Sequence, residues 1–240
     1  MTFDILTLFP EMFEGIINSS IIKRAIEKGL ITINIIDFRE YAGNKHMTVD
    51  DYAYGGGAGM LIRVDPIHRA LQNIPNIDKA YKILTSPSGH IWSQQKAEEL
   101  SKKDHIVIIC GHYEGIDNRI TNYIDEEISV GDYVLTGGEI PAAILFDSIS
   151  RLIPGVIKDE STQQESFTTG ILEYPQYTRP PVYDGYEVPE ILLSGHHANI
   201  AKWQRYQALK KTYLNRPDLL EKVELSKEDL KMLEEIKNEA

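Results

Sequence analysis

The alternation of strand-type and helix-type segments is the feature that most constrains how this chain can fold. Three apolar runs each lead into a turn: "YKILTS" (81–86), "HIVIIC" (105–110) and "DYVLT" (132–136). Helical segments follow the first and third turns, and two further strands are predicted at 2–8 and 31–37. Strands that alternate with helices predict an α/β fold with a parallel sheet. Loops beyond the carboxyl ends of such strands gather at one edge and bind ligands, so we expect the three turns to converge.

Apolar spacing predicts where the helices lie. One apolar series with i, i+4 spacing predicts a single helix: Phe13, Ile17, Ile21 and Ala25. Gly29 is predicted to end this helix. Two C-terminal helices are predicted near 197–213 and 226–237, and the last one, which alternates Lys and Glu, is predicted to be solvated. Residues 158–166 are polar and without periodicity, which predicts a linker between an α/β domain and a C-terminal part.

Composition indicates a globular protein of a reducing compartment. Apolar residues make up 42% and charged residues 25% of the chain, which are ordinary values. The single Cys110 lies in an apolar run, which excludes a disulfide framework and predicts a buried thiol. The N-terminal segment lacks a basic leader, no apolar stretch approaches the ~20 residues of a membrane span, and the histidines show no metal-ligand spacing. We therefore expect a cytoplasmic protein without a metal cage.

Charge is distributed unevenly along the chain. The net charge of −11 argues against non-specific coating of nucleic acid. Between Ile191 and Pro217 there is no Asp or Glu, and aromatic side chains accompany the cations of that segment: Lys202, Arg205, Lys210, Lys211 and Arg216. Two interpretations are open from these residues, a helical surface that happens to be basic and a local contact with a polyanion.

The third turn, "GDYVLTGGE" (131–139), has unusual neighbours for a glycine turn. It brings Asp132 and Glu139 where a phosphate site would bring a lysine, and the chain has neither G-x-G-x-x-G after a strand nor a Walker A sequence. A ligand held by backbone groups beside carboxylates should be neutral or positively charged, and S-adenosylmethionine with its sulfonium meets that description. The usual methyltransferase fold is disfavoured, because the first strand is not followed by a glycine motif.

Eight blocks of sequence stand in order over almost the whole chain: "LFPEMF", "VDDYAYGGGAGM", "CGHYEGID", "ISVGDYVLTGGEIPA", "DSISRLIPGV", "ESFTTGILEYPQYTRP", "VPEILLSGHH" and "IAKW". In these blocks the chain resembles the TrmD family, the bacterial tRNA (guanine-N1)-methyltransferases of the SPOUT superfamily. Several blocks are long and unusual, so the resemblance is specific.

The resemblance implies a fold and an organisation that periodicity does not. It implies an α/β, SPOUT-type parallel sheet with a trefoil knot, whereas periodicity alone predicts a plain open sheet. It implies a knotted catalytic domain at 1–158 that binds S-adenosylmethionine, a flexible linker at 159–166 and a small, mostly helical tRNA-binding domain at 167–240. It also implies a homodimer with active sites shared between chains, acting on the guanosine 3′-adjacent to the anticodon of tRNA.

Carried over position by position, the resemblance assigns the methyl donor to the three turns. The implied donor-binding residues are Leu84, Thr85, Ser86, Pro87, Gly111, Glu114, Val130, Gly131, Asp132, Tyr133, Val134, Leu135, Gly137, Gly138 and Pro141. The family commonly has Gln in place of Ser88, so one side-chain contact is expected to be missing.

The chemistry of methylation at nitrogen-1 of guanine needs two further groups. That nitrogen carries a proton, so a general base must remove it, and a cation or donor must stabilise the charge that builds on the neighbouring carbonyl oxygen. The resemblance assigns the second role to Arg151 and the first to Glu165, where the family has aspartate. Asp159 and Glu160 are the alternative bases. Two other interpretations stay open: an intrahelical pair of Arg151 with Asp147, and acids that are only solvated.

The same carry-over assigns tRNA contacts to two parts of the chain. The implied residues are Asp50, Gly55, Gly57, Gly59, Ser166, His196, Lys202 and Arg205. Glycines beside a flipped nucleotide allow close approach. Gln204 stands where the family commonly has arginine, which weakens one phosphate contact or moves it to Arg205. A divalent ion is left open, as are two rival functions: a non-catalytic RNA-binding protein, and a SPOUT enzyme with another target position.

Overall fold

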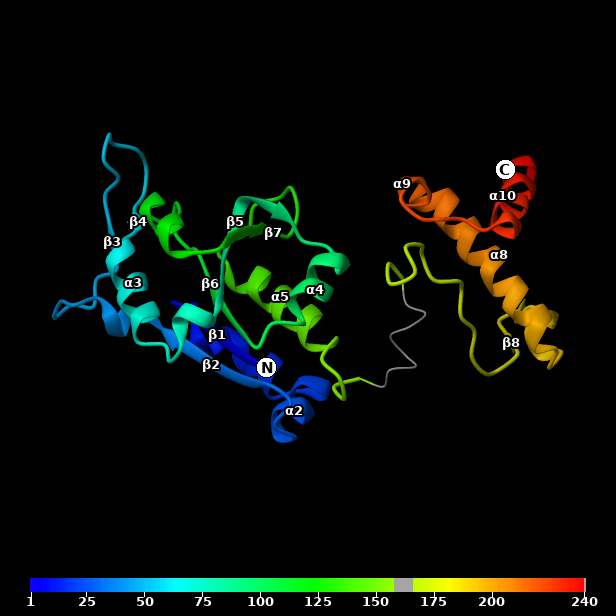
Figure 1. The fold of residues 1–240 in the computed structure, drawn as a ribbon, viewed down its shortest axis with the longest axis horizontal. Helices are drawn as coiled ribbons and strands as arrows, with labels where there is room; N and C mark the ends of the chain where they lie inside the picture. Colours follow the sequence, from blue (N-terminus) through cyan, green and yellow to red (C-terminus); the bar gives the residue numbers. More distant parts are fainter. Residues whose placement is uncertain (158–165, 240) are drawn as a thin grey trace. The chain divides into compact units, whose positions relative to one another are not determined.

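The computed structural model describes residues 1–157 and 166–239, and the chain divides into two compact units, Met1–Lys158 and Asp159–Ala240 (Figure 1). Each unit has a hydrophobic core of its own. We refer to them as the first and the second unit.

The first unit is built on a five-stranded parallel sheet. Its strands are β1 (Thr2–Thr7), β2 (Thr32–Asp37), β5 (Tyr81–Ile91), β6 (His105–Ile109) and β7 (Glu126–Ser129). They lie in the order β2-β1-β6-β5-β7, with Thr2 of β1 aligned to Thr32 of β2 and to His105 of β6. The predicted parallel α/β sheet is confirmed, and β1, β2 and β6 fall where the apolar runs placed them. The trefoil knot stays a prediction.

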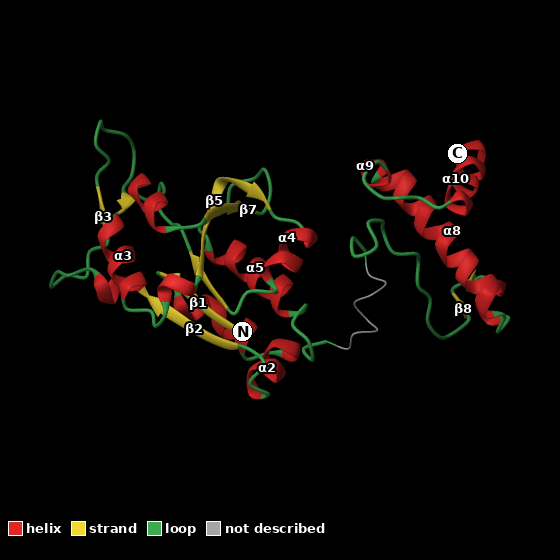
Figure 2. Cartoon of the chain, in the orientation of Figure 1, coloured by secondary structure: helices red, strands yellow, loops and turns green. Residues whose placement is uncertain are grey.

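Helices pack on both faces of this sheet, because successive strand residues point to opposite sides. Ile5 and Ile108 belong to one core with α2 (Ser20–Glu27), α4 (Gln94–Leu100) and α5 (Glu139–Ser150). Leu6 and Ile109 belong to the other core with α3 (Val64–Gln72). Figure 2 distinguishes the strands from the helices around them. Cys110 is fully buried in the first of these cores, and burial raises the pKa of its thiol, so the predicted core role is confirmed.

The prediction of a strand at 132–136 is wrong. The third strand of the three strand-to-turn units is β7, and residues Gly131 to Gly138 form the loop between β7 and α5. Val134 is 89% exposed, so the apolar run "DYVLT" lies on the surface of this loop and is not part of the sheet. The acidic residues of β7 obscure its strand character, and they are tolerated because β7 is an edge strand whose Glu126 binds Lys96.

The predicted turn after "YKILTS" belongs to strand β5. The pairing of β5 with β7 is irregular, because Thr85 and His90 both align with Ile128. Residues 86–89 therefore bulge out of the strand, as expected where an extra stretch of chain interrupts a ladder. The bulge displays Ser86, Pro87 and Ser88 at the edge of the sheet where the loops after β6 and β7 also emerge.

The single helix predicted before Gly29 is three short elements. They are the 3₁₀ helix η1 (Pro10–Phe13), α1 (Glu14–Ile17) and α2. The backbone of Ser20 has a φ of 51°, and this break shifts the buried positions to Ile22 and Ala25 while Ile21 is 40% exposed. Gly29 does end the helix, as predicted.

Smaller elements complete the first unit. They are the 3₁₀ helices η2 (Phe38–Tyr41), η3 (Ile77–Lys79) and η4 (Asn118–Tyr123), and the antiparallel pair β3 (Asp50–Asp51) and β4 (Leu61–Ile62). The β3–β4 pair carries the glycine-rich loop 52–60.

The second unit is mostly helical. It contains the hairpin β8 (Val182–Tyr183) and β9 (Tyr186–Glu187), followed by α7 (Glu190–Leu193), α8 (His197–Asn215), α9 (Pro217–Leu220) and α10 (Lys227–Glu239). The two predicted C-terminal helices are confirmed. The prediction that the last one is solvated is wrong, because Met232, Leu233 and Ile236 form a buried stripe against α8 while the Lys and Glu residues take the outer face. No described helix has the length and apolar composition that crossing a bilayer requires.

Candidate active site

The three turns line one cavity of about 450 Å³ at the edge of the sheet. All of the donor-binding residues predicted from the sequence lie around it except Asp132. The loop after β7 contributes the largest share, and Pro141 of α5 completes the wall. The predicted convergence of the turns is therefore confirmed as geometry.

Further residues line this cavity that the sequence did not single out. They include Ser88, His112, Tyr113, Ile116, Asn118, Glu127, Ser129 and Thr136. Each lies within a few residues of a predicted one, so their position in the same turns was the available signal. The Nδ1 atom of His112 accepts a hydrogen bond from the backbone N–H of Tyr113 at 2.9 Å.

Close backbone packing joins the turns at the base of the cavity. The N–H of Gly138 donates to the carbonyl of Gly111 at 2.7 Å, and the hydroxyl of Thr85 donates to the carbonyl of Ile109 at 3.1 Å. A Cβ atom on Gly138 would lie 2.2 Å from Oγ1 of Thr85 and 2.6 Å from the backbone nitrogen of Gly111. Only glycine fits there, which explains why this turn is glycine-rich without being a phosphate loop.

The charges around the cavity suit a neutral or cationic ligand. Among the described residues that line it, Glu114 and Glu127 are acidic and none is Lys or Arg. The carboxylate of Glu127 accepts a hydrogen bond from the hydroxyl of Ser88 at 3.1 Å. Glu139, at the start of α5, is buried and accepts from the hydroxyl of Thr7 at 2.8 Å. A polyphosphate would find no cationic partner in this lining.

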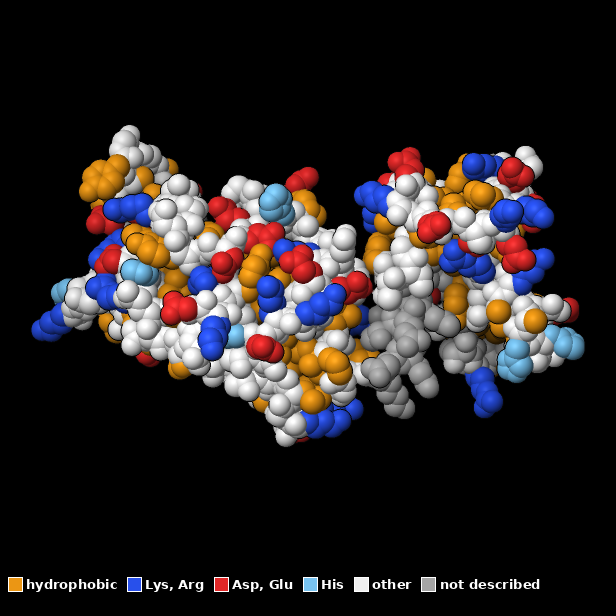
Figure 3. Space-filling view, in the orientation of Figure 1, with side chains coloured by type: hydrophobic (Ala, Val, Ile, Leu, Met, Phe, Trp, Pro, Cys, Tyr) orange, Lys and Arg blue, Asp and Glu red, His pale blue; other side chains and the backbone are white. Residues whose placement is uncertain are grey.

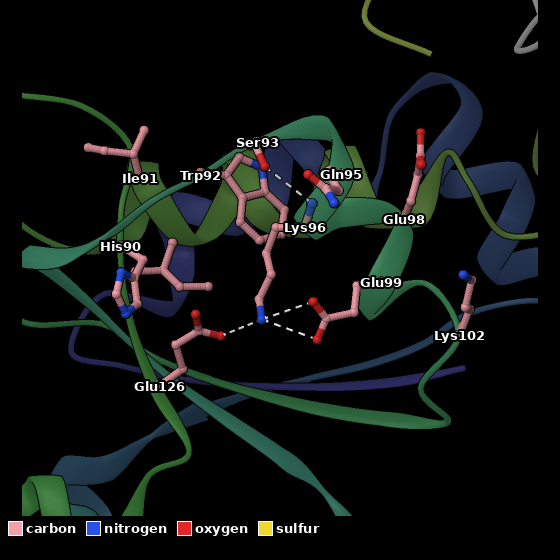
Figure 4. A pocket seen from close by; sticks show the side chains of 11 residues that line it. His90, Ile91, Trp92, Ser93, Gln95, Lys96, Glu98, Glu99, Lys102 and Glu126 are labelled. Carbon is pink, nitrogen blue, oxygen red and sulfur yellow. Dashed lines mark hydrogen bonds and ion pairs between the residues drawn. The ribbon is translucent and has the colours of Figure 1, made fainter. Parts of the chain in front are cut away.

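A second cavity, of about 470 Å³, has a different chemistry (Figure 4). Its Lys96 lies between Glu126 and Glu99, with nitrogen–oxygen distances of 2.8 Å and 3.2 Å. Burial lowers the pKa of Lys96, but the hydrogen bonds with the two glutamates outweigh that effect and raise it overall. The hydroxyl of Tyr81 also donates to Glu126. The charged groups of this network are paired with one another. We therefore interpret it as a structural network that links β5, β7 and α4.

The predicted catalytic pair is only partly described. Arg151 follows α5, and its backbone N–H donates to the carbonyl of Asp147 at 3.1 Å. Arg151 is half-buried and makes a further interaction. Glu165, Asp159 and Glu160 lie outside the described residues. Groups of His, Cys, Asp and Glu able to hold a metal ion do not occur among the residues that the structure describes.

The glycine-rich loop 52–60 is held against the cavity that the three turns line. Asp50 aligns with Ile62 in the β3–β4 pair, and the carbonyl of Met60 accepts from the N–H of Glu114 at 3.1 Å. Gly59 has a φ of 75°, and a Cβ atom there would meet the Glu114 side chain at 2.4 Å. Gly55 and Gly57 also have positive φ, with open space around them. Of this set of predicted tRNA contacts, the structure brings Gly59 against a residue that lines the cavity, whereas Gly55 and Gly57 lie in the exposed part of the loop.

Several basic side chains of the second unit already form ion pairs within the protein, which the sequence did not indicate. Arg205 binds Asp229 through two hydrogen bonds, of 2.7 Å and 3.0 Å. Lys210 pairs with Glu239, and Arg216 with Asp218. Figure 3 shows acidic and basic side chains interspersed over this face of the unit. Within residues 1–157 and 166–239, Lys202 and Lys211 form no ion pair.

The aromatic side chains of the basic segment also serve the fold. Tyr206 and Tyr213 pack against the core of the second unit, and Trp203 lies 6.4 Å from Tyr177, ring centre to ring centre. Ser166 accepts a hydrogen bond from the N–H of Glu173 at 2.9 Å, whereas His196 is exposed before α8. Lys202 and His196 are thus the predicted contacts of this unit that stay accessible.

Asp229 holds the start of α10, and we expect its contribution to stability to depend on pH. Its carboxylate binds Arg205 and also accepts from the N–H and hydroxyl of Ser226, in a capping box. Chiefly the Arg205 hydrogen bonds lower the pKa of Asp229 from 3.8 to about 2. The folded pKa is depressed, so this stability is present above about pH 4 and is lost as pH falls through about 2.

Replacing Asp229 by asparagine should therefore cost about 2 kcal/mol at pH 7, the order of magnitude of that shift. Chemical denaturation at a series of pH values measures it, with the difference from the unaltered protein shrinking toward pH 2. Asp218→Asn, which removes a surface ion pair with Arg216, is the matched control and should change little. A difference that persists unchanged at about pH 2 would rule out the ion pair as its source.

Comparisons with known proteins extend over almost the whole chain. The sequence profile of the family described as tRNA (Guanine-1)-methyltransferase TrmD matches residues 1–222. A Dictyoglomus turgidum protein named tRNA (guanine-N(1)-)-methyltransferase is 55% identical over 98% of this chain and 96% of its own length. Proteins of the same name from Staphylococcus aureus and Staphylococcus haemolyticus are 54% and 51% identical, over 99% and 100% of this chain and 98% of their own lengths.

Proposed function

This chain belongs to the tRNA (guanine-1)-methyltransferase family TrmD, and on that basis we propose that it transfers a methyl group from S-adenosylmethionine to nitrogen-1 of the guanosine 3′-adjacent to the tRNA anticodon. The observation that carries the donor half of this proposal is the cavity formed by the three turns, whose described lining is rich in backbone groups and has no Lys or Arg.

The cavity residues fit this donor in size and in charge. Leu84, Ile116 and Val134 offer apolar surface for an adenine ring, and the loop after β7 offers backbone donors and acceptors for a ribose. Glu114 and Glu127 provide negative charge near a positively charged ligand. The bound donor supplies an activated methyl group, and the residues of the chain orient it and keep water away.

The acceptor half of the reaction requires proton removal and charge stabilisation. We assign the general base to Glu165 and the stabilisation of the guanine carbonyl oxygen to Arg151. The base takes the proton from nitrogen-1, and the electron pair that this frees forms the new N–CH₃ bond. The electron pair of the breaking CH₃–S bond returns to sulfur, which leaves as a neutral thioether. Arg151 lies about 15 Å along α5 from Pro141 at the wall of the cavity, so its role rests on the active site that a homodimer would share between chains.

One experiment separates this proposal from its rivals. Purified protein, unmodified tRNA and methyl-labelled S-adenosylmethionine are incubated, and the nucleosides are then identified by mass spectrometry. We expect 1-methylguanosine at the position 3′ of the anticodon. A label on ribose or at another position would favour a different specificity, and no label despite RNA binding would favour a non-catalytic protein.

We further propose that the chain acts as a homodimer through the outer face of α5. Ile140 and Ile144 of α5 are 47% and 40% exposed, and with Met12 they line an apolar groove of about 480 Å³. Apolar side chains gathered in this way are typical of a surface that a partner covers. The molar mass in solution, expected at twice the 27.3 kDa of one chain, tests this proposal.

For the second unit we propose a role in holding tRNA, with a contact from Lys202 of α8, which has no ion-pair partner among the described residues. Reversing its charge in Lys202→Glu should raise the KM for tRNA several-fold and leave kcat and donor affinity unchanged, because one phosphate contact is lost. Steady-state kinetics at two salt concentrations measures this effect, which should shrink at higher salt. Lys231→Glu on α10 is the control. Equal effects of the two variants would show that only overall charge matters.

A further inference from the structure

Two tyrosines of the loop 52–60 are more exposed than any role in folding requires. Tyr52 is 80% exposed and Tyr54 is fully exposed. Neither side chain makes a ring contact or a side-chain hydrogen bond with another described residue. Exposed aromatic rings of this kind stack well on nucleobases, because every base presents an apolar face.

The stem of this loop is fixed against the donor cavity. The N–H of Ile62 donates to the carbonyl of Gly115, and the N–H of Asp117 donates to the carbonyl of Ile62, both at 2.9 Å. Glu114 and Gly115 themselves line the donor cavity. The two tyrosines therefore lie on a short loop anchored directly at its rim, where they can act on a substrate that reaches the donor.

A separate cavity of about 340 Å³ lies between this loop and the segment that begins η4. Tyr52, Tyr54, Arg63 and Arg119 line it, together with three aspartates: Asp51, Asp65 and Asp117. Both arginines are held by neighbouring carboxylates, Arg63 by Asp65 and Arg119 by Asp117.

These charges decide what the cavity can take. Each guanidinium is already neutralised by a carboxylate, so the lining is a poor phosphate site. The aspartates offer acceptors and the arginines donors to the edge of an uncharged heterocycle, and the tyrosines offer flat apolar faces. A neutral nucleobase matches this combination.

We propose that this cavity receives the base of a nucleotide that flanks the target guanosine, stacked on Tyr52 and Tyr54. This inference rests on the proposed function, since it takes tRNA as the substrate. The two tyrosines are positioning residues: they hold the neighbouring base aside while the target guanine enters the donor site. A base that must leave its stack in the RNA regains stacking on the protein.

The test combines enzyme variants with altered RNA. In the double variant Tyr52→Leu and Tyr54→Leu, the KM for an anticodon stem-loop should rise about 5- to 100-fold, the range found when base–aromatic stacking is removed. Donor affinity by calorimetry and the thermal midpoint should not change, because both side chains are exposed. The matched double variant with phenylalanine keeps the flat rings and should bind as the unaltered protein does.

Stem-loops that lack the base on the 5′ or the 3′ side of the target guanosine identify the bound base. One of the two abasic RNAs should bind the unaltered protein more weakly than the intact RNA does. The leucine variant should bind that abasic RNA and the intact RNA with the same affinity. Unchanged RNA affinity in the leucine variant would overturn the inference. So would independent effects, in which removing either base weakens RNA binding by the leucine variant as much as it weakens binding by the unaltered protein. A change in molar mass instead of RNA affinity would overturn it in favour of an interface between copies.

Failure of this inference is distinguishable from failure of the proposed function. Stem-loop affinity can be measured by fluorescence anisotropy without any methylation. If the unaltered protein forms 1-methylguanosine and the leucine variant has full RNA affinity, only the inference is wrong. If no 1-methylguanosine forms, but the leucine variant and one abasic RNA weaken stem-loop binding without adding to each other's effect, only the proposed reaction is wrong.

Discussion

Replacing Glu165 by glutamine should slow methyl transfer about 100- to 10,000-fold, the usual contribution of a general base. Glutamine has nearly the shape of glutamate but cannot accept the proton of nitrogen-1, so the guanine stays poorly nucleophilic. The donor cavity is made by the three turns of the first unit, and donor affinity should therefore be unchanged. Single-turnover methylation with labelled donor, together with calorimetry of donor binding, measures both quantities.

The neighbouring acids supply the controls. Asp159→Asn and Glu160→Gln should retain most of the activity, and Glu165→Asp, which carries the family's usual residue, should remain active. A misplacement of a reacting group by about 1 Å can cost on the order of 100-fold, so Glu165→Asp also measures how the linker seats the longer side chain. Near-normal turnover by the glutamine variant, with a loss in Glu160→Gln, would move the base to Glu160.

Replacing Gly138 by alanine should abolish donor binding and destabilise the first unit by about 1–3 kcal/mol, the usual cost of overpacking. The added Cβ would lie 2.6 Å from the backbone nitrogen of Gly111 and 2.8 Å from Cα of Cys110, and neither backbone atom can move without shifting β6. The hydrogen bond from Gly138 to Gly111, which closes the base of the cavity, would open. Calorimetry with S-adenosylmethionine and thermal unfolding test this expectation.

Gly15→Ala is a matched control for this variant. Gly15 lies in α1, where a Cβ atom would have no neighbouring atom within 4 Å, and alanine is the better helix former. The substitution should therefore leave donor affinity unchanged and stabilise the protein slightly. Full donor affinity in Gly138→Ala would show that the turns can separate without loss of the site.

The sequence predicts the parallel sheet well because its central strands are continuous apolar runs. β1 and β6 are buried on both faces beneath helices, which explains their apolar composition. β7 was missed for the opposite reason. It lies at the edge and begins with Glu126 and Glu127. Distant parts of the chain bind these two carboxylates, through an ion pair from Lys96 to Glu126 and a hydrogen bond from Ser88 to Glu127.

The strand and turn pattern predicted the convergence of the three turns better than the charge pattern predicted the surface of the second unit. The residues that the resemblance assigns to the methyl donor lie within three short turns, and of that set only Asp132 is not part of the cavity lining. The charge pattern overestimates how many cations of the basic segment are unpaired, because their ion-pair partners are remote in sequence. Asp229 lies 24 residues from Arg205, and Glu239 lies 29 residues from Lys210. A charge count along the chain cannot register such pairs.

The strand order has a consequence for how the chain is made. β1 lies between β2 and β6, and the ring of Phe3 packs edge-on against Phe146 at 4.9 Å. At a synthesis rate of about 5–20 residues per second, the first strand waits roughly 5 to 30 s on the ribosome for those neighbours. During that interval its apolar side chains lack their final cover, so the N-terminal segment is the part of the nascent polypeptide most in need of a chaperone.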